Sequence, residues 1–436
     1  MNKATSLIIL VLLVSQGING CFYDLFNGIS SDNTLQFSGS SHLSERFISQ
    51  NTKYVILRNN GIKSIANGAF SGLPRMKVLD LSNNNLLPKD FFAFGHHKNV
   101  EAIIFDDNFH ENASSTDLEI KISHNYPKLK FLSLRNVGLI TISSDFSTYF
   151  VGLSHLDLSR NNLNHKDVFT HLPDTVQSLC IENSGFSSIS TTSSYSLTNI
   201  RNISLNHNNI GDVVLTGAHG KCDSSANPIV CLRLPHVTTF LAANCSLSIF
   251  VVKEKLPMKK LDLSSNQIYY LSNDSLVYLN VLKHLNIGNN PLSGMLGMSL
   301  LPRLEVLIMD NVNSTMAEVF IYSIFNTRIK YLSISGNLLK ELPNHMMKNF
   351  KNAVELNLSN NLLKSLDLDQ NVSNLYSLVH VNVSDNIIED LGFVKLRRHY
   401  HVQLLDIRRN PLTSLNISSF SGVQRNTNVL LSSTCS

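Results

Sequence analysis

Leucines recur along this chain in short alternating phrases rather than in long apolar runs. In VLDLSNNNL, residues 78–86, Leu79 and Leu81 flank the polar residue Asp80, and Asn84 follows. Near-copies are HLDLSRNNL at 155–163, KLDLSSNQI at 260–268 and ELNLSNNLL at 355–363. This alternation predicts a short β-strand whose leucines point inward, while the residue between them points to solvent.

The phrase belongs to a repeat that fits the template L-x-x-L-x-L-x-x-N-x-L. Eleven copies have asparagine at the ninth position: Asn60, Asn84, Asn108, Asn161, Asn208, Asn266, Asn290, Asn337, Asn361, Asn386 and Asn410. Four weaker copies have another residue there: Val137, Ser184, Cys245 and Val312. Most copies lie 23 to 25 residues apart, but 37 residues separate Asn208 from Cys245. The sequence therefore predicts about fifteen stacked turns.

The residue at the asparagine position is called the rung of its turn. An inward asparagine amide can hydrogen-bond to backbone groups of neighbouring turns, which a buried turn must satisfy. We expect the rungs to form a ladder, with a cysteine tolerated at Cys245. Val137 and Val312 cannot hydrogen-bond through their side chains, so they are predicted to be weaker rungs.

Apolar residues also recur in the returning half of each turn. They are predicted to form a second buried row beneath the outer side, and they are Phe70, Leu73, Phe146, Phe150, Phe169, Leu172, Leu276, Leu279 and Leu375.

With AFSGLPRMKVLDLSNNNL at 69–86, the rhythm of about 24 residues resembles the typical leucine-rich repeat of animal extracellular proteins. Toll-type ectodomains and secreted, coil-less insect leucine-rich immune proteins look similar. The resemblance covers about residues 52–412 and implies an α/β solenoid. It would be a leucine-rich repeat horseshoe with a parallel β-sheet on the concave face, and loops and short helical turns on the convex face. Many relatives have cysteine clusters at both ends, whereas here only Cys21 and Cys435 are present.

The first twenty residues have the pattern of a secretory signal peptide. Lys3 supplies a positive charge, the apolar run 7–14 is too short to span a bilayer, and small residues follow. Cleavage after Gly20 would place Cys21 first, as in a bacterial lipoprotein, although Asn19 fits that signal poorly. We expect a secreted, extracellular protein without a membrane span, with residues 1–20 as signal peptide and 21–51 as an N-terminal cap region. Residues 52–412 would be the solenoid, with an inserted loop at about 215–236, and 413–436 a C-terminal cap or tail.

Six cysteines in an exported chain permit disulfide bonds. Cys222 and Cys231 both lie in the inserted loop, and we predict that they pair. Cys21 and Cys435 lie at opposite ends of a stack roughly 70 Å long, so they cannot bond to each other within one chain. Cys180 occupies the solvent position of its strand, where it would bond to the inserted loop, bond to another molecule or remain a free thiol. Cys21, Cys180 and Cys435 are therefore candidates for interchain bonds in a disulfide-linked homo- or hetero-oligomer, and Cys245 is expected to be buried.

Glycosylation is plausible on an exported chain, although the number of sequons is no more than composition predicts. The candidates are Asn112, Asn202, Asn244, Asn273, Asn313, Asn357, Asn371, Asn382 and Asn416. Glycans at Asn357 and Asn382 would cover the C-terminal part of the concave face.

Charge and motifs argue against nucleic acid as a partner and against catalysis. The 36 basic and 32 acidic residues give a net charge of +4, without a basic block. GAHGKC at 217–222 lacks the first glycine and final Ser/Thr of a phosphate-binding loop, and neither HExxH nor GxSxG occurs. His96, His97 and RRHYH at 397–401 lack a third ligand at metal-binding spacing. We expect neither enzyme activity nor a cofactor.

The solvent positions of the strands offer mixed charges on a rigid surface, which suits an extracellular protein or glycan partner. The candidate ligand face is Asp80, Asp106, Arg135, Asp157, Arg160 and Glu182. The resemblance implies a non-catalytic recognition protein, either an innate-immune binder or a Toll-like decoy. The alternatives are an adhesion or extracellular-matrix protein, and a non-catalytic carrier subunit of a secreted complex. The identity of the ligand is not encoded in the repeat, because the framework does not depend on it.

Overall fold

Two compact units make up the chain in the computed structural model. The first contains Met1–Phe186 and Asn199–Asn208, and the second contains Ser187–Thr198 and Asn209–Ser436. The structure describes residues 34–36, 50–111, 113–163, 165–186, 193–220, 229–293, 300–312, 328–342, 352–368, 377–396, 400–413, 415 and 419–431.

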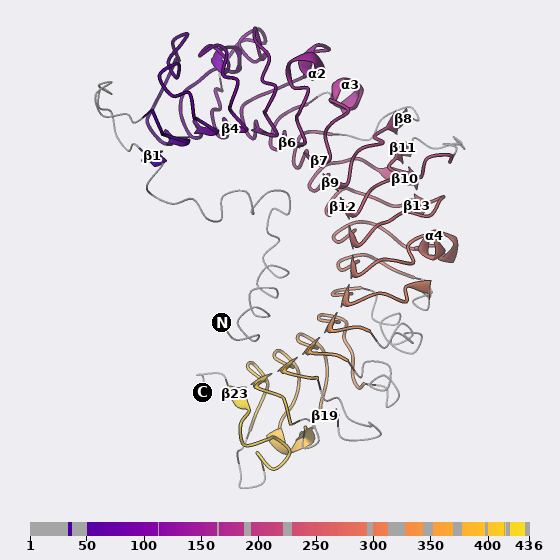
Figure 1. Cartoon of the computed structure of the whole chain (residues 1–436). Helices are drawn as coiled ribbons and strands as arrows, with labels where there is room; N and C mark the ends of the chain where they lie inside the picture. Colours follow the sequence, from indigo (N-terminus) through magenta and orange to yellow (C-terminus); the bar gives the residue numbers. More distant parts are fainter. Residues whose placement is uncertain are drawn as a thin grey trace. The chain divides into compact units, whose positions relative to one another are not determined.

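Parallel strands of three residues, one for each turn, form the inner sheet of both units (Figure 1). In the first unit they are β1 (Thr34–Gln36), β2 (Tyr54–Ile56), β3 (Val78–Asp80), β4 (Ala102–Ile104), β5 (Phe131–Ser133), β6 (His155–Asp157), β7 (Ser178–Cys180) and β9 (Asn202–Ser204). In the second unit they are β12 (Thr239–Leu241), β14 (Lys260–Asp262), β15 (His284–Asn286), β16 (Val306–Ile308), β17 (Tyr331–Ser333), β18 (Glu355–Asn357), β20 (His380–Asn382), β22 (Leu404–Asp406) and β23 (Asn428–Leu430). The parallel-sheet solenoid predicted from the repeat is confirmed.

The return segments carry the remaining elements. A second parallel sheet in the second unit has the order β13–β10–β11–β8, and β19 pairs with β21. The bounds are β8 (Ser193–Ser196), β10 (Asp212–Thr216), β11 (Ile229–Arg233), β13 (Phe250–Val252), β19 (Leu366–Asp367) and β21 (Val394–Lys395). Helical turns are short, namely α2 (Phe146–Tyr149), α3 (His165–His171), α4 (Asn273–Val277), η4 (Pro88–Asp90) and η6 (Leu391–Phe393).

The central residue of each inner strand packs in register with its neighbours. Val55 pairs with Leu79, Leu79 with Ile103, and Ile103 with Leu132, and all four side chains are fully buried. Burying one such side chain contributes about 2 kcal/mol. A row of stacked aliphatic residues therefore forms the core directly behind the strands.

The rungs form the expected ladder. The Asn84 Nδ2 donates to the carbonyl oxygens of Leu57 and Leu81, each at 2.8 Å. Its Oδ1 accepts from the backbone N–H groups of Asn60 at 3.0 Å and Ile62 at 3.1 Å. The same pair of carbonyl contacts, one in the preceding turn and one in its own, recurs at Asn108, Asn161, Asn208, Asn266, Asn290, Asn361, Asn386 and Asn410.

The four substituted rungs behave according to their chemistry. The Ser184 hydroxyl donates to the Leu158 carbonyl of the preceding turn at 3.1 Å, so serine replaces one asparagine contact. The buried Cys245 thiol donates to the Ala243 carbonyl at 3.4 Å. Val137 and Val312 are buried as well, and their side chains form no hydrogen bond. Their backbone N–H groups donate to the Oδ1 atoms of the asparagine rungs in the next turn, Asn161 and Asn337.

The second apolar row is present on the outer side. Its members Phe70, Leu73, Phe146, Phe150, Leu276 and Leu279 are buried. Phe169 and Leu172 are half-buried, and Leu375 lies outside the described residues. The row also contains aromatic residues that the sequence did not single out, because Phe92 packs against Phe105, Tyr126 and Phe150 with ring centroids 5.2 to 5.5 Å apart.

The long repeat between Asn208 and Cys245 contributes more structure than the predicted loop. β10 and β11 both come from this segment and pair in parallel, with Asp212 opposite Ile229 and Thr216 opposite Arg233. β11 is inserted between β10 and β8, as Figure 1 shows. The inserted residues therefore add a strand to the outer sheet.

Candidate functional site

The inner strip of the first unit contains most of the predicted ligand face. It is defined here as the residues at the last strand position and at the position two residues later, from β2 to β9. Its members include Asp80, Asp106, Arg135, Asp157 and Glu182, which lie on successive turns. Parallel strands place these side chains side by side, about 4.8 Å apart from turn to turn.

Asp80 is held within the strip from two sides. Its Oδ1 accepts from the backbone N–H of Ser82 at 3.1 Å and from the Ser82 hydroxyl at 2.7 Å. Its other oxygen forms an ion pair with the guanidinium of Arg58 in the preceding turn. Only 1% of Asp80 is exposed, whereas about half of the Arg58 side chain remains in solvent.

Asp106 forms the next link. Its Oδ1 accepts from the Ser133 hydroxyl at 2.5 Å and from the backbone N–H of Arg135 at 3.0 Å. Burial raises the pKa of the Asp106 carboxyl to about 7, and the neighbouring carboxylates of Asp157 and Asp107 add to this rise. The two hydrogen bonds oppose it by stabilising the charged form.

Asp157 and Glu182 continue the strip. The Asp157 Oδ1 accepts from the backbone N–H of Ser159 at 2.8 Å, and burial raises the pKa of this carboxyl too. The Glu182 carboxylate accepts from the Ser204 hydroxyl and from the Asn206 amide, the latter at 3.2 Å. Adjacent turns are thus joined through side chains as well as through the backbone.

The sequence predicts that the side chain at the last position of each inner strand faces solvent. This expectation is wrong for much of the first unit. Asp80, Ile104, Ser133, Asp157, Cys180 and Ser204 are all at most 8% exposed. Alternation does point these side chains away from the leucine core, but neighbouring turns are close enough for the side chains to bond to one another. As a result, four members of the predicted ligand face use their carboxylates to stabilise the sheet, namely Asp80, Asp106, Asp157 and Glu182.

An exposed edge runs beside the strip and is called the turn ridge. Its residues precede the rungs and have left-handed backbone conformations with φ between 48° and 60°: Asn59, Asn83, Asp107, Asn136, Arg160, Asn183 and His207. Asn136 donates to the Asp107 carboxylate at 2.8 Å. Arg160 is the member of the predicted ligand face that is fully exposed, while Arg135 is half-buried.

Apolar side chains interrupt the inner face at β4 and β5. Ala102, Ile104 and Phe131 form a buried cluster, and Val78 packs against it. The inner face is therefore apolar at this point between its charged residues.

Cysteines on both sheets are oxidised. Cys180 and Cys231 each take part in a disulfide bond. Cys180 is 2% exposed, so the expectation that it faces solvent is wrong, and its disulfide bond rules out the free thiol among the alternatives left open. Cys21, Cys222 and Cys435 lie outside the described residues, and the Cys222–Cys231 pairing remains a prediction.

The sequons occupy different surroundings. Asn244 and Asn273 are exposed, and Asn202 is half-buried. The Asn357 Nδ2 donates to the Ser333 hydroxyl at 2.9 Å, and the Asn382 Oδ1 accepts from the backbone of Ser384 at 3.0 Å. Asn112, Asn313, Asn371 and Asn416 lie outside the described residues.

The histidines noted in the sequence have structural contacts. The His97 Nε2 lies 3.0 Å from the Leu73 carbonyl, and burial lowers the pKa of this imidazole. His96 stands beside His124 with ring centroids 6.3 Å apart. Among the described residues, no three metal-binding side chains come together, and no helix is long and apolar enough to cross a membrane. Part of 397–401 is outside the described residues.

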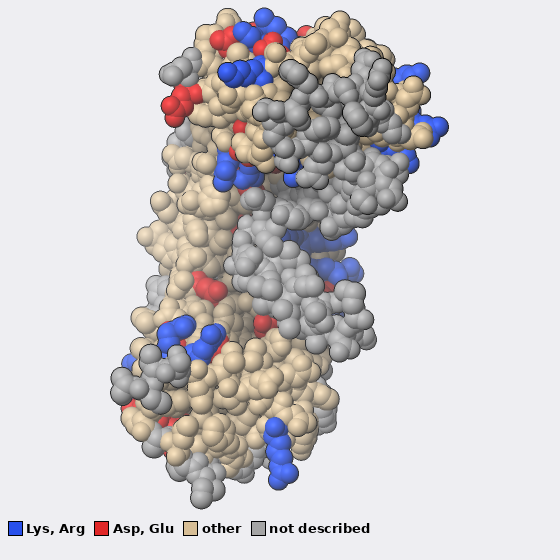
Figure 2. Space-filling view, turned by 90° about the vertical axis from the view of Figure 1, so that its left-hand side faces the viewer, with Lys and Arg blue, Asp and Glu red and all other residues tan. Residues whose placement is uncertain are grey.

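Charge on the surface is mixed. Figure 2 shows basic and acidic side chains next to one another, separated by broad uncharged areas. Within the described part of that face, no continuous stripe of one sign is visible.

Known proteins share this architecture. A family model described as leucine-rich repeat matches residues 50–108. The structure is similar to TLR13 from a complex with the RNA ssRNA13, at 22% identity and a TM-score of 0.64 over 89% of this chain and 53% of that one. No curated protein matches the sequence.

Two further solved structures are similar to this chain. Toll from the Drosophila Toll–Spatzle complex has 16% identity and a TM-score of 0.50, over 87% of this chain and 55% of that one. A leucine-rich repeat protein of Leptospira interrogans has 16% identity and a TM-score of 0.59, over 90% of this chain and 100% of that one. The chain spans about half the length of the two Toll-type receptors. These likenesses establish a leucine-rich repeat solenoid that resembles Toll-type ectodomains in fold.

Proposed function

We propose that this chain is a secreted, non-catalytic recognition protein that binds an extracellular protein or glycan through its inner face. The observation that carries the proposal is the network of the inner strip, in which side-chain contacts join β2 to β3, β4 to β5, β6 to β7 and β7 to β9. A surface that is ordered before binding loses little conformational entropy when a partner docks. Arg160, which is exposed, and Arg135, which is half-buried, lie beside this network and would make the contacts.

A protein or glycan partner suits this surface better than a nucleic acid. The carboxylates of Asp80 and Glu182 line the strip and would repel phosphates that approach Arg58 and Arg135. Binding of nucleic acid draws most of its affinity from neutralised phosphates, which requires an excess of basic groups. The mixture of charges instead offers complementary pairing to a folded surface.

Two features bear on the biological setting. Residues 1–20 have the pattern of an export signal, and the solenoid is similar in fold to receptors that were solved with an RNA and with the protein Spatzle. An innate-immune binder, or a decoy that competes with a Toll-type receptor, fits both features. Export is tested by expressing the full chain in animal cells and looking in the medium for a product that lacks residues 1–20.

The decisive experiment captures partners from the native extracellular fluid with the secreted protein as bait and identifies them by mass spectrometry. The bait is compared with a double variant of the inner face, Arg135→Ala with Arg160→Ala. The matched control is Arg75→Ala with Arg303→Ala, which removes the same charges from exposed positions outside the strip. A true partner should bind the face variant at least about tenfold more weakly, because each lost charge-assisted contact is worth roughly 1.5–3 kcal/mol.

Equal capture by the face variant and the unchanged protein would overturn the assignment of the inner face. A partner that is lost equally from both double variants would indicate attraction by net charge alone, and would also contradict the proposal. Near-native circular dichroism spectra of both variants exclude misfolding as the cause of a loss.

A further inference from the structure

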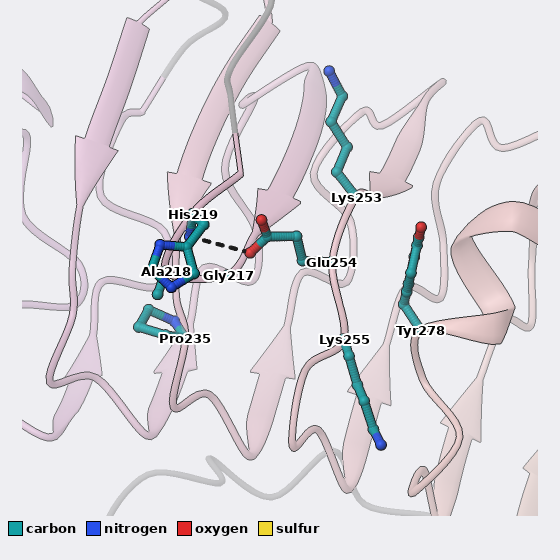
Figure 3. A pocket seen from close by; sticks show the side chains of 8 residues that line it. All are labelled: Gly217, Ala218, His219, Pro235, Lys253, Glu254, Lys255 and Tyr278. Atoms are coloured by element: carbon teal, nitrogen blue, oxygen red, sulfur yellow. Dashed lines mark hydrogen bonds between the residues drawn. The ribbon is translucent and has the colours of Figure 1, made fainter.

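The outer side of the second unit carries a pocket that is separate from the inner strip. Its volume is about 470 Å³, and it is lined by Gly217, Ala218, His219, Pro235, Lys253, Glu254, Lys255 and Tyr278 (Figure 3). These residues come from four segments, and the inserted repeat supplies two of them.

The parallel outer sheet explains why these segments meet. β10, β11 and β13 all run in the same direction, so the residues after their last positions lie at one edge. The backbone N–H of Lys253 donates to the Leu215 carbonyl at 2.9 Å, which holds β13 against β10 at this edge. The Leu256 N–H donates to the Tyr278 carbonyl at 3.2 Å and fixes the segment after α4.

The chain packs tightly around Glu254. Its Oε2 accepts from the backbone N–H of His219 at 3.3 Å, as Figure 3 shows. A Cβ at Gly217 would lie 2.3 Å from the same oxygen, and one at Gly220 would lie 3.1 Å from the carboxyl carbon. A side chain at Gly217 would displace the carboxylate, and one at Gly220 would first collide with the Thr216 side chain. The segment 217–220 therefore needs both glycines to pack against β10 and Glu254.

Hydrogen-bonding capacity remains unused at the ends of the strands that form this edge. Among the described residues, the buried Oγ1 of Thr216 and Nε of Arg233 have no hydrogen-bond partner. The Arg233 Nη2 donates to the Gly220 carbonyl at 3.3 Å, so this guanidinium supports the glycine segment. Buried polar groups are normally satisfied, so these two atoms behind the glycine segment are exceptions, although neither residue lines the pocket itself.

We propose that this pocket binds an anionic carbohydrate, with sulfate or carboxylate groups as the anions. Lys253 and Lys255 extend from opposite sides of Glu254 in Figure 3 and provide two separate cationic ends for acidic groups on successive sugar units. The central Glu254 carboxylate accepts hydrogen bonds from sugar hydroxyls. The Tyr278 ring and Pro235 offer apolar walls for the faces of sugar rings, and such a mixture of apolar walls and a few polar groups is characteristic of binding pockets.

Isothermal titration with defined oligosaccharides at 0.15 M salt tests this site. The probes are a fully sulfated tetrasaccharide, a tetragalacturonate that carries carboxylates alone, and neutral maltotetraose. At least one anionic probe should bind and maltotetraose should not. The response to the first two probes shows whether sulfate or carboxylate is the preferred anion.

Two double variants separate the pocket from general charge effects. Lys253→Ala with Lys255→Ala should weaken binding of the anionic probe about tenfold or more, because two charge-assisted contacts are lost. Lys63→Ala with Lys121→Ala removes two exposed lysines of the first unit and should leave affinity unchanged. Tyr278→Ala should weaken binding severalfold, whereas Tyr278→Phe should retain it.

Several results would overturn the pocket assignment. They are no binding by either anionic probe, equal binding of maltotetraose, or equal losses in the two lysine variants. The test does not depend on the inner face, because Arg135→Ala with Arg160→Ala should leave carbohydrate affinity intact even if it abolishes capture of a macromolecular partner.

Discussion

The hydroxyl of Ser133 donates a hydrogen bond to the carboxylate of Asp106 across 2.5 Å and links strand β5 to the turn that follows strand β4. An equivalent link joins Ser333 to Asp310 at 2.6 Å in the second unit. In both places the acid also accepts the backbone N–H two residues beyond the serine. The acid after the strand is therefore a recurring tie between turns.

The raised pKa of Asp106 predicts how stability depends on pH. In the folded chain the pKa of this carboxyl is about 7, whereas its ordinary pKa is 3.8. The folded chain therefore holds the proton at pH values where the unfolded chain has lost it. The stability that this proton provides is complete below pH 3.8 and is lost as the pH rises to about 7. Asp106→Asn should therefore match the native protein near pH 4 and exceed its unfolding free energy by about 2–4 kcal/mol at pH 7.5. Urea unfolding at both values measures this, and an unchanged difference between the two pH values would contradict it.

Loss of a rung should destabilise the solenoid strongly. The Asn161 amide bonds to five backbone groups, with donors and acceptors between 2.8 and 3.3 Å apart. Asn161→Ala should lower the unfolding free energy by about 3 kcal/mol, because buried peptide groups in two turns lose their partners. The adjacent exposed Asn162→Ala provides the control and should cost less than about 0.5 kcal/mol. Similar unfolding midpoints for the two variants would argue against the ladder as a stabilising element.

Leu338 is a site where substitution should increase stability. It has φ of 55° and is 57% exposed, while Gly61, Gly138 and Gly185 fill the equivalent position after other rungs. A left-handed conformation costs a branched side chain about 1–2 kcal/mol, and asparagine tolerates it better. Leu338→Asn should raise the unfolding free energy by about 1 kcal/mol and the melting temperature by a few degrees. Leu338→Ala removes the exposed side chain but not the strain, so an equal gain from alanine would refute this explanation.

The cysteines should differ in their response to alkylation. Native protein treated with iodoacetamide should show no modification at Cys180, Cys231 or Cys245, because the first two are in disulfide bonds and the third is buried. Unfolding without a reductant should expose Cys245 to the reagent but leave Cys180 and Cys231 protected. Peptide mass spectrometry gives the result directly, and labelling of Cys180 before reduction would contradict the disulfide assignment.

The solenoid itself could be predicted because its signals are local. Alternation around Leu79 fixes the strand, and the recurrence of asparagine fixes the stacking of turns, so both follow from one repeat read at a time. The weaker rungs at Val137 and Val312 were also visible, since valine has no polar side-chain atoms.

The partners of the strip residues could not be predicted in the same way. Alternation shows that Asp106 points away from the leucines, but its partner Ser133 is 27 residues away and lies in a repeat of unusual length. The burial of Cys180 depends on neighbouring turns for the same reason. The strand β11 could have been predicted, because IVCLR at 229–233 has the apolar and β-branched composition of a strand. The two cysteines of this segment instead favoured a loop closed by a disulfide bond.

Each rung bonds only to backbone atoms of its own turn and the one before it, and no rung reads the identity of any side chain on the inner face. A gene segment of about 24 codons, cut from one rung to the next, could be duplicated or deleted without altering the rung-to-backbone contacts of the remaining asparagine turns. The extent of the inner face is thus free to change in whole steps during evolution. Recombination between repeats can lengthen or shorten this protein while the asparagine rungs of the surviving turns keep their hydrogen bonds to the backbone.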